Sequence, residues 1–179
     1  QRVRLASGDR LHARGDPPTG WYAVLRGAIK ASNVTPEGKE VALTFIEPGG
    51  WFGEISLLDG WPRTHDGIAH GETELLQVPP AAFDVLLQRH PTLLRAIAQL
   101  LCNRLRLAFL AIEDYNTLPL ENRLAKQLIN LARTYGEPAP DGVRLKLRLP
   151  QEELAQLLGA SRQRVNAELS QWAKCGWVT

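Results

Sequence analysis

The chain has 179 residues, of which 44% are hydrophobic, which suits one or two folded domains with buried cores and excludes a disordered chain. Its longest apolar stretches fall far short of the roughly 18 residues that a membrane-spanning helix needs, so we expect no membrane segment. Lys and Arg number 21 against 19 Asp and Glu, a net charge of +2, which excludes a polycation that binds nucleic acid along its whole length.

Charge and cysteine content narrow the function classes further. Residues 1–116 hold 12 basic and 13 acidic side chains, whereas residues 117–179 hold 9 and 6, so any surface for nucleic acid is expected in the second part. Cys102 and Cys175 lie far apart and form no CxxC pair, which argues against disulfides, a zinc ribbon or a protein-ligated iron–sulfur cluster. We therefore expect no metal site and a reducing, cytoplasmic location.

The first 80 residues are typical of an all-β domain. Gly27, Gly38, Gly49, Gly60 and Gly71 recur every eleven residues and separate short runs of apolar residues. These runs predict strands over 21–25, 28–34 and 41–46, with a hairpin turn at 36–39 between the last two. Such spacing favours a jelly roll or sandwich.

After Pro79 and Pro80 the hydrophobic period lengthens to that of helices. A short helix is predicted over 81–88 and an uninterrupted one over 91–116. Apolar residues on the long helix alternate four and three apart, the pattern of a coiled-coil seam, and we expect it to be the dimer interface rather than the core of a monomeric bundle. The seam comprises Leu94, Ala98, Leu101, Leu105, Ala108, Ile112 and Tyr115.

A second domain is predicted after the break at 117–119. It begins with a helix over 120–135 and a loop over 136–142. Residues 143–149 alternate apolar and basic residues, which predicts a half-buried strand whose outward face carries three cations. Residues 176–178 resemble the beginning of another strand, and most of a wing would then lie beyond Thr179.

Residues 150–173 have the features of a helix-turn-helix. Ala155 is small where two helices would cross, Gly159 accepts the positive φ that ends the first helix, and Ser161 caps the second. Val165, Leu169 and Trp172 would bury the inner face of that second helix. The outward residues of its first turns can form paired hydrogen bonds with base edges. Together with the cap, the predicted DNA-binding residues are Ser161, Arg162, Gln163, Arg164 and Asn166.

Taken together, the predicted barrel, the seam helix and the segments QEELA (151–155) and LGASRQRVN (158–166) resemble the superfamily of the cyclic-AMP receptor protein and the fumarate–nitrate regulator (CRP/FNR). The resemblance implies an α+β chain with a cyclic-nucleotide-binding-like jelly roll (1–90), a dimerisation helix (91–116) and a winged helix-turn-helix (117–179). It also implies a homodimeric bacterial transcription factor that binds pseudo-palindromic operator DNA and works with RNA polymerase.

The recognition helix also departs from the family pattern. An arginine matching Arg162 contacts guanine in the family, but Gln163 stands where several members have glutamate, and Ala167 replaces a further arginine. The family's usual half-site sequence is therefore not expected to hold for this chain.

A candidate effector pocket is similar to the family's phosphate-binding segment. An arginine fork suits a phosphate anion, backbone N–H groups can supplement it, and a carboxylate can accept a hydrogen bond from a ribose 2′-OH. Nine positions separate Glu54, the candidate carboxylate, from Arg63, the candidate fork. The candidate pocket residues are Gly53, Glu54, Ile55, Ser56, Arg63 and Thr64.

The effector itself stays open at this point. Members that sense cyclic AMP carry a Thr-Ser pair on the long helix, and Ala108 and Phe109 stand there instead. Phe109 could stack on a purine, and Arg104 or Asn103 could supply polar contacts, so cyclic AMP or another cyclic nucleotide is one hypothesis. The Glu54–Arg63 pair could equally be an internal ion pair with no ligand. His65 could be a pocket ligand or a haem-type axial group, but a lone loop histidine is more often an ordinary surface residue, and His12 is expected in a loop or at a strand end.

Three functions are thus weighed: an effector-gated transcription factor, a regulator that binds DNA constitutively with the barrel as a scaffold, and a nucleotide-sensing module that acts on something other than DNA. The recognition helix argues against the third. No paired carboxylates, nucleophile–base motif or metal-ligand spacing indicates catalysis, so no catalytic residue is expected.

Overall fold

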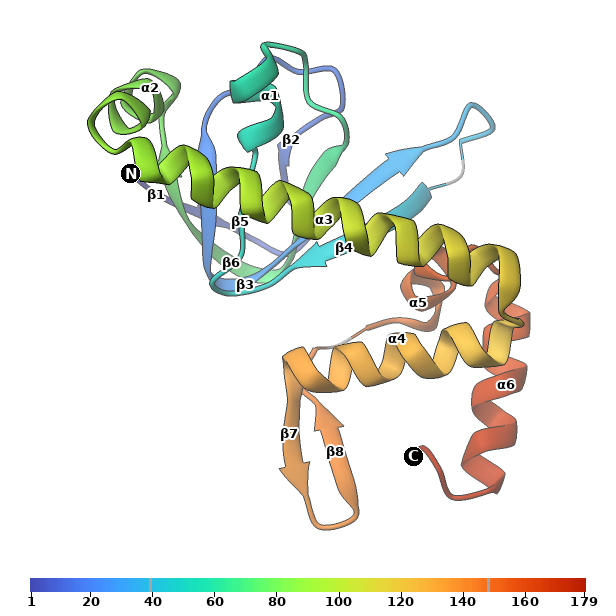
Figure 1. Cartoon of the computed structure of the whole chain (residues 1–179). Helices are drawn as coiled ribbons and strands as arrows, with labels where there is room; N and C mark the ends of the chain where they lie inside the picture. Colours follow the sequence, from blue (N-terminus) through green and yellow to red (C-terminus); the bar gives the residue numbers. More distant parts are fainter. Residues whose placement is uncertain (39, 148) are drawn as a thin grey trace. The chain divides into compact units, whose positions relative to one another are not determined.

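A computed structural model describes residues 1–38, 40–147 and 149–179. The chain divides into two compact units, Gln1–Leu105 and Arg106–Thr179, and each is described by itself (Figure 1). The α+β fold expected from the sequence is confirmed. Within the described residues, no helix is both long and apolar enough to cross a membrane.

The first unit is built on an antiparallel sheet in which β1, β6, β3 and β4 are neighbours in that order. Two short strands complete it, β2 pairing with β6 and β5 with β3. Apolar side chains of β3, β5 and β6 fill the barrel, among them Tyr22, Phe52 and Leu75. The strands are β1 (Arg2–Leu5), β2 (Arg10–His12), β3 (Trp21–Val34), β4 (Glu40–Ile46), β5 (Trp51–Phe52) and β6 (Asp66–Val78).

The strands predicted over 21–25 and 28–34 form one continuous strand, β3, with a bend at Gly27. The register with β6 shifts on both sides of Arg26, and Gly27 has a φ of 75°. A Cβ at Gly27 would lie 2.5 Å from the carbonyl oxygen of Glu72, so only glycine lets the two strands approach here. The glycine predicted as a strand boundary is thus a bulge inside one strand.

Three helices belong wholly or partly to the first unit. They are α1 (Glu54–Asp59), α2 (Pro80–Arg89) and the first part of α3 (Pro91–Thr117). Phe83 of α2 and Ile97 of α3 pack with Trp21 in a second core cluster, against which Leu101 also packs. Leu101, predicted in the dimer seam, is therefore half-buried within its own subunit.

The second unit holds the end of α3, then α4 (Leu120–Tyr135), α5 (Gln151–Leu157) and α6 (Arg162–Lys174). Pro119 precedes α4, as the predicted break at 117–119 requires. Leu124, Leu154 and Val165 lie in one core cluster shared by the three complete helices, with Leu169 and Trp172 packed against it. The positions predicted to bury the second helix of the motif are confirmed as its inner face.

The predicted loop over 136–142 was wrong. Residues Gly136–Ala139 form β7, which pairs with β8 (Gly142–Leu145) in a hairpin (Figure 1). The strand predicted over 143–149 ends at Leu145, which pairs with Gly136 at the start of β7. Beyond that pair the facing chain is the end of α4, whose last residue, Tyr135, accepts one hydrogen bond from the backbone N–H of Lys146. Val143, predicted to be half-buried, is 60% exposed, since a two-stranded hairpin covers only one face.

Of the three cations predicted on this strand, Arg144 and Lys146 are exposed, and Lys146 pairs with Glu137. Arg148 lies outside the described residues. The strand predicted to begin at 176–178 is also wrong. Gly176 has a φ of 73°, and Trp177 turns back toward the ring of Trp172, with 6.4 Å between ring centroids.

Candidate effector pocket and DNA-binding surface

The pocket begins where β5 ends and α1 starts. Gly53 lies between them with a φ of 91°, a left-handed conformation that favours glycine. A Cβ on Gly53 would lie 2.8 Å from Nη1 of Arg63 and 2.8 Å from the carbonyl oxygen of Gly20. Glycine is needed here both for the turn and for the close approach of the guanidinium group.

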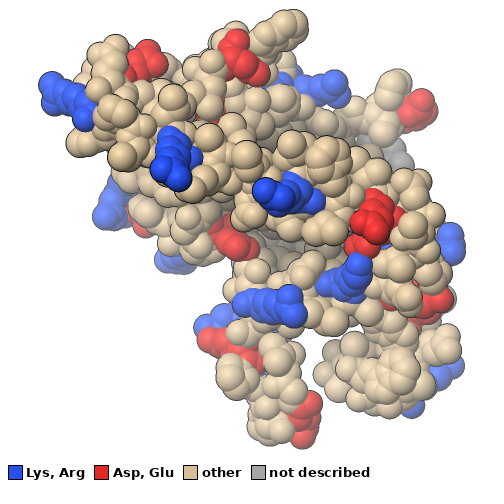
Figure 2. Space-filling model, viewed as in Figure 1, with Lys and Arg blue, Asp and Glu red and all other residues tan. Residues whose placement is uncertain are grey.

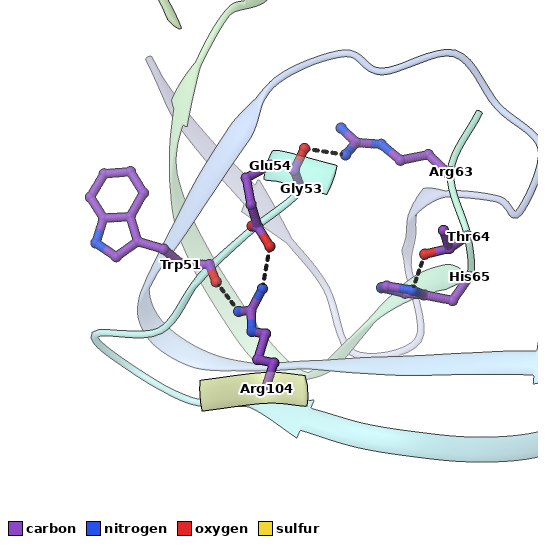
Figure 3. A network of polar contacts seen from close by, with 7 residues as sticks. All are labelled: Trp51, Gly53, Glu54, Arg63, Thr64, His65 and Arg104. Atoms are coloured by element: carbon purple, nitrogen blue, oxygen red, sulfur yellow. Dashed lines mark hydrogen bonds and ion pairs between the residues drawn. The ribbon is translucent and has the colours of Figure 1, made fainter. Parts of the chain in front are cut away.

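Arg63 is a buried cation, only 4% exposed. Its Nη1 donates to the carbonyl of Gly53 at 2.9 Å (Figure 3). Its Nη2 donates to the carbonyl of Gly20 at 2.7 Å. Its Nε has no hydrogen-bond partner, and no carboxylate of the described residues lies within ion-pair distance. Burial lowers the pKa of Arg63 below its ordinary value, although the nearby charges of Glu54 and Asp16 act in the opposite direction. Arginine stays charged, so the site holds a buried positive charge that has no direct ion-pair partner among the described residues.

Glu54 is fully buried and has one engaged and one unengaged oxygen. Its Oε1 accepts a 2.5 Å hydrogen bond from Nη1 of Arg104, which reaches it from α3 (Figure 3). The other terminal nitrogen of Arg104 donates to the carbonyl of Trp51. Glu54 Oε2 has no partner among the residues that the structure describes. The Glu54–Arg63 ion pair weighed from the sequence is wrong, because Arg104 is the partner.

The remaining predicted pocket residues surround these two. Ser56 is buried and donates to the carbonyl of Pro62 at 3.2 Å, so it ties α1 to the segment that carries Arg63. Ile55 is half-buried, and Thr64 is exposed. Phe109 belongs to the second unit and is 61% exposed, so its contact with an effector stays a prediction.

Two histidines were underestimated from the sequence. His12 lies at a strand end, as predicted, but it is buried there at the end of β2. His65, expected as an ordinary surface residue, is half-buried with its ring centroid 6.2 Å from that of His12. His65 Nδ1 lies 2.8 Å from the hydroxyl of Thr64 (Figure 3). Burial, and then the charge of Arg63, lower the pKa of His65 and bring that of His12 to about 4. Both rings are neutral near pH 7, so they add no charge to the pocket.

The buried ring of His12 makes the protein sensitive to acid. Unfolded His12 binds a proton below about pH 6.5 and the folded ring only below about pH 4, so its contribution is full above the unfolded pKa and is lost as pH falls between these values. We expect the free energy of unfolding to drop by about 2 kcal/mol between pH 7 and pH 5 through His12 alone. Urea unfolding of the wild type and of His12→Gln measures this.

The matched control for His12 is His90→Gln, which removes an exposed histidine at the end of α2. The difference in unfolding free energy between wild type and His12→Gln should shrink on acidification, whereas the difference for His90→Gln should hardly change. Parallel pH profiles for wild type and His12→Gln would contradict the assignment.

The second surface is the outward side of α6. Ser161 adopts an extended conformation before the helix, and its Oγ accepts a 3.3 Å hydrogen bond from the backbone N–H of Arg164. Gly159 has a φ of 58°. The predicted cap and turn are thus confirmed. Val165 is fully buried, which turns the opposite side of the helix outward.

All the residues predicted to read DNA are exposed at the start of α6. Neither Arg162 nor Arg164 has an ion-pair partner in the described part of the chain, and the first turn holds no acidic residue. The face of the molecule in Figure 2 intersperses basic and acidic side chains. The net charge of +2 likewise indicates that any attraction to DNA is local. The five residues are Ser161, Arg162, Gln163, Arg164 and Asn166.

The predicted dimer stripe on α3 is largely uncovered in the single chain. Leu105 is 55% and Ile112 is 56% exposed, and Leu94, Ala98 and Ala108 are exposed as well. Large apolar side chains on one helix at such exposure are typical of an interaction surface. Tyr115 differs from the others, because its hydroxyl donates to the carbonyl of Leu157 in the helix-turn-helix at 2.6 Å.

Comparisons with known proteins identify the two domains. Residues 2–90 match the family described as the cyclic nucleotide-binding domain, and residues 122–179 match the Crp-like helix-turn-helix domain. Over 178 residues, the chain is 32% identical to the CRP-like cAMP-activated global transcriptional regulator of Mycobacterium tuberculosis, covering 99% of this chain and 80% of that protein. The chain belongs to the CRP/FNR family of transcription factors.

Two further relatives are similar over most of their length. The global nitrogen regulator of Synechocystis is 33% identical over 150 residues, 83% of this chain and 67% of that protein. A solved CRP/FNR regulator from Thermus thermophilus superimposes with a TM-score of 0.81 at 30% identity, covering 98% of this chain and 87% of that one. This CRP/FNR chain is therefore a DNA-binding transcriptional regulator and not an enzyme.

Proposed function

We propose that this CRP/FNR regulator binds a cyclic nucleotide between α1 and residues 62–65 and that the nucleotide controls its binding to operator DNA. The observation that carries the proposal is the buried guanidinium of Arg63, which has no carboxylate partner in the described chain. Burying a charge is costly unless an opposite charge compensates it. The phosphodiester of a cyclic nucleotide supplies one negative charge of suitable size.

The residues present fit both halves of such a ligand. The unpartnered Nε of Arg63 can donate to a phosphate oxygen, and the exposed hydroxyl of Thr64 lies in the next position. The unpartnered Oε2 of Glu54 can accept a hydrogen bond from a ribose 2′-OH. Because the Gly53 and Gly20 carbonyls already hold the guanidinium, the arginine is positioned before any ligand arrives.

Titration calorimetry tests this proposal on the purified full chain with cyclic AMP, cyclic GMP and a cyclic dinucleotide as separate ligands. Each titration is paired with a binding assay on a duplex that the protein itself enriches from a random pool. We expect one of the mononucleotides to bind and to raise DNA affinity. Binding of none of them, with DNA affinity unchanged by all, would refute the proposed effector.

We further propose that two copies associate along the stripe Leu94, Ala98, Leu105, Ala108 and Ile112 of α3. A C2 dimer built on this helix would present two α6 helices to half-sites about one DNA turn, roughly 34 Å, apart. The dimer would act on operator DNA in the cytoplasm together with RNA polymerase.

Placing a charge on the apolar stripe should dissociate the dimer. Leu105→Lys is expected to sediment as a monomer and to bind a two-half-site operator about 100-fold more weakly or worse, because the second half-site contact is no longer intramolecular. Gln99→Lys adds the same charge at an exposed α3 position outside the stripe and should stay dimeric. A wild-type monomer in sedimentation equilibrium would refute the dimer.

A second candidate function has a specific observation in its favour. Arg104 already bridges Glu54 and the carbonyl of Trp51, which closes part of the site from within the first unit. This arrangement suits a regulator that binds DNA without an effector and uses the barrel as a scaffold. Operator affinity that no added nucleotide changes, in a protein that binds none, would favour this alternative.

A further inference from the structure

The last turns of α3 contact the turn of the helix-turn-helix through one side chain. The hydroxyl of Tyr115 donates to the carbonyl of Leu157, the last residue of α5, at 2.6 Å. The final carbonyls of a helix lack partners within the helix, so an external donor stabilises this end of α5. Both residues lie in the second unit, so the contact belongs to one compact body.

The ring of Tyr115 also lies against the turn itself. A Cβ on Gly159 would be 3.2 Å from Cε1 of Tyr115 and 3.5 Å from its hydroxyl oxygen. Glycine at this position therefore serves the left-handed turn, with φ of 58°, and the approach of an aromatic ring. The recognition helix begins at Arg162, three positions later.

Helix α4 holds the same ring from another direction. The guanidinium carbon of Arg123 lies 4.5 Å from the centre of the Tyr115 ring, within the range of a cation–π contact. Burial raises the pKa of Tyr115 above its ordinary value, although the charge of Arg123 opposes this, so the hydroxyl keeps its proton and remains a donor. Lys126 and Asp114 join the same two helices at 2.6 Å, but this pair is exposed and contributes little.

We infer that Tyr115 is the positioning residue that sets the orientation of the recognition helix relative to the end of the dimer helix. The residue touches no DNA. Tyr115 acts through Leu157 and Gly159, which lie just before the N-terminal end of α6. Arg123 fixes the Tyr115 ring. The inference rests on the proposed dimer, since the orientation matters only when two recognition helices must meet two half-sites at a fixed separation.

The preference of the protein for one spacing between operator half-sites is the measurement that reports the orientation of the recognition helices. Inserting one base pair between half-sites rotates one half-site by about 35° relative to the other. Wild type should prefer the enriched operator over versions with one base pair added or removed. The ratio of the affinity for the enriched operator to that for an operator with one base pair added or removed should be about tenfold lower in Tyr115→Ala than in wild type. Tyr115→Phe keeps the ring but loses the hydrogen bond, so its ratio should lie between those two values.

The control is Leu128→Ala, which truncates a side chain packed on the core cluster of the second unit, a cluster that does not include Tyr115. We expect it to lower the unfolding midpoint but to keep the spacing ratio. If Tyr115→Ala lowers the midpoint and keeps the wild-type ratio, or if it sediments as a monomer, the positioning role is overturned. If the wild type itself shows no preference for one half-site spacing, both the positioning role and the proposed dimer are refuted.

Discussion

Replacing Arg63 by alanine is expected to abolish the dependence of operator binding on nucleotide. Truncating one partner of a buried charge pair costs about 2 to 5 kcal/mol, so nucleotide affinity should fall by about 30-fold to several thousandfold. The residue is 4% exposed, and no carboxylate in the described chain forms an ion pair with it, which makes the ligand phosphate its expected direct partner. Calorimetric titration and an operator-binding assay on the same preparation measure both effects.

Two further variants separate binding from folding. Arg63→Lys keeps the charge but loses the fork that holds the carbonyls of Gly53 and Gly20, so we expect weak but measurable nucleotide binding. Arg10→Ala removes an exposed arginine of the same unit and should leave affinity unchanged. Full nucleotide affinity in a folded Arg63→Ala protein would contradict the proposed phosphate site.

Arg162→Ala is expected to weaken operator binding by about 1 to 3 kcal/mol and to relax specificity at one base pair in each half-site. The side chain is exposed at the first position of α6, carries no acidic partner in the described chain, and can bond a guanine edge through two nitrogens. Affinities for operators with each base substituted in turn reveal the relaxed position. Stability should hardly change, because the side chain packs against nothing in the core.

Arg164→Ala is the matched comparison within the same helical turn. If this residue meets the phosphate backbone, its loss should weaken binding to all sequences alike and reduce the salt slope by about one per subunit. The cap survives, because Ser161 bonds the backbone N–H of Arg164 and not its side chain. Equal losses at every base for both variants would contradict this division between base and phosphate contacts.

The features that the sequence predicted correctly depend on neighbours along the chain. The bounds of α2, α3 and α4 came within one or two residues, because period and proline positions act over a few residues. The cap at Ser161, the turn at Gly159 and the burial of Val165 likewise follow from local conformation and helical spacing. The two domain types could be identified for the same reason.

The predictions that failed concern residues whose structure depends on contacts with another strand or element. Gly27 resembles a strand boundary in sequence, but the close approach of β6 makes it a bulge. Residues 136–139 contain a proline and a glycine, and only pairing with β8 makes them a strand. Val143 alternates like a buried residue, yet nothing covers its side of the hairpin.

By itself, then, the sequence determined the order of helices and strands, the residues that face outward on α6, and Arg63 and Glu54 as pocket candidates. Only the tertiary structure decided their partners. Glu54 meets Arg104, 50 positions away, and Tyr115 meets Leu157, 42 positions away. Periodicity carries no information about contacts at such separations, because they arise from packing between elements and not from the conformation of either one.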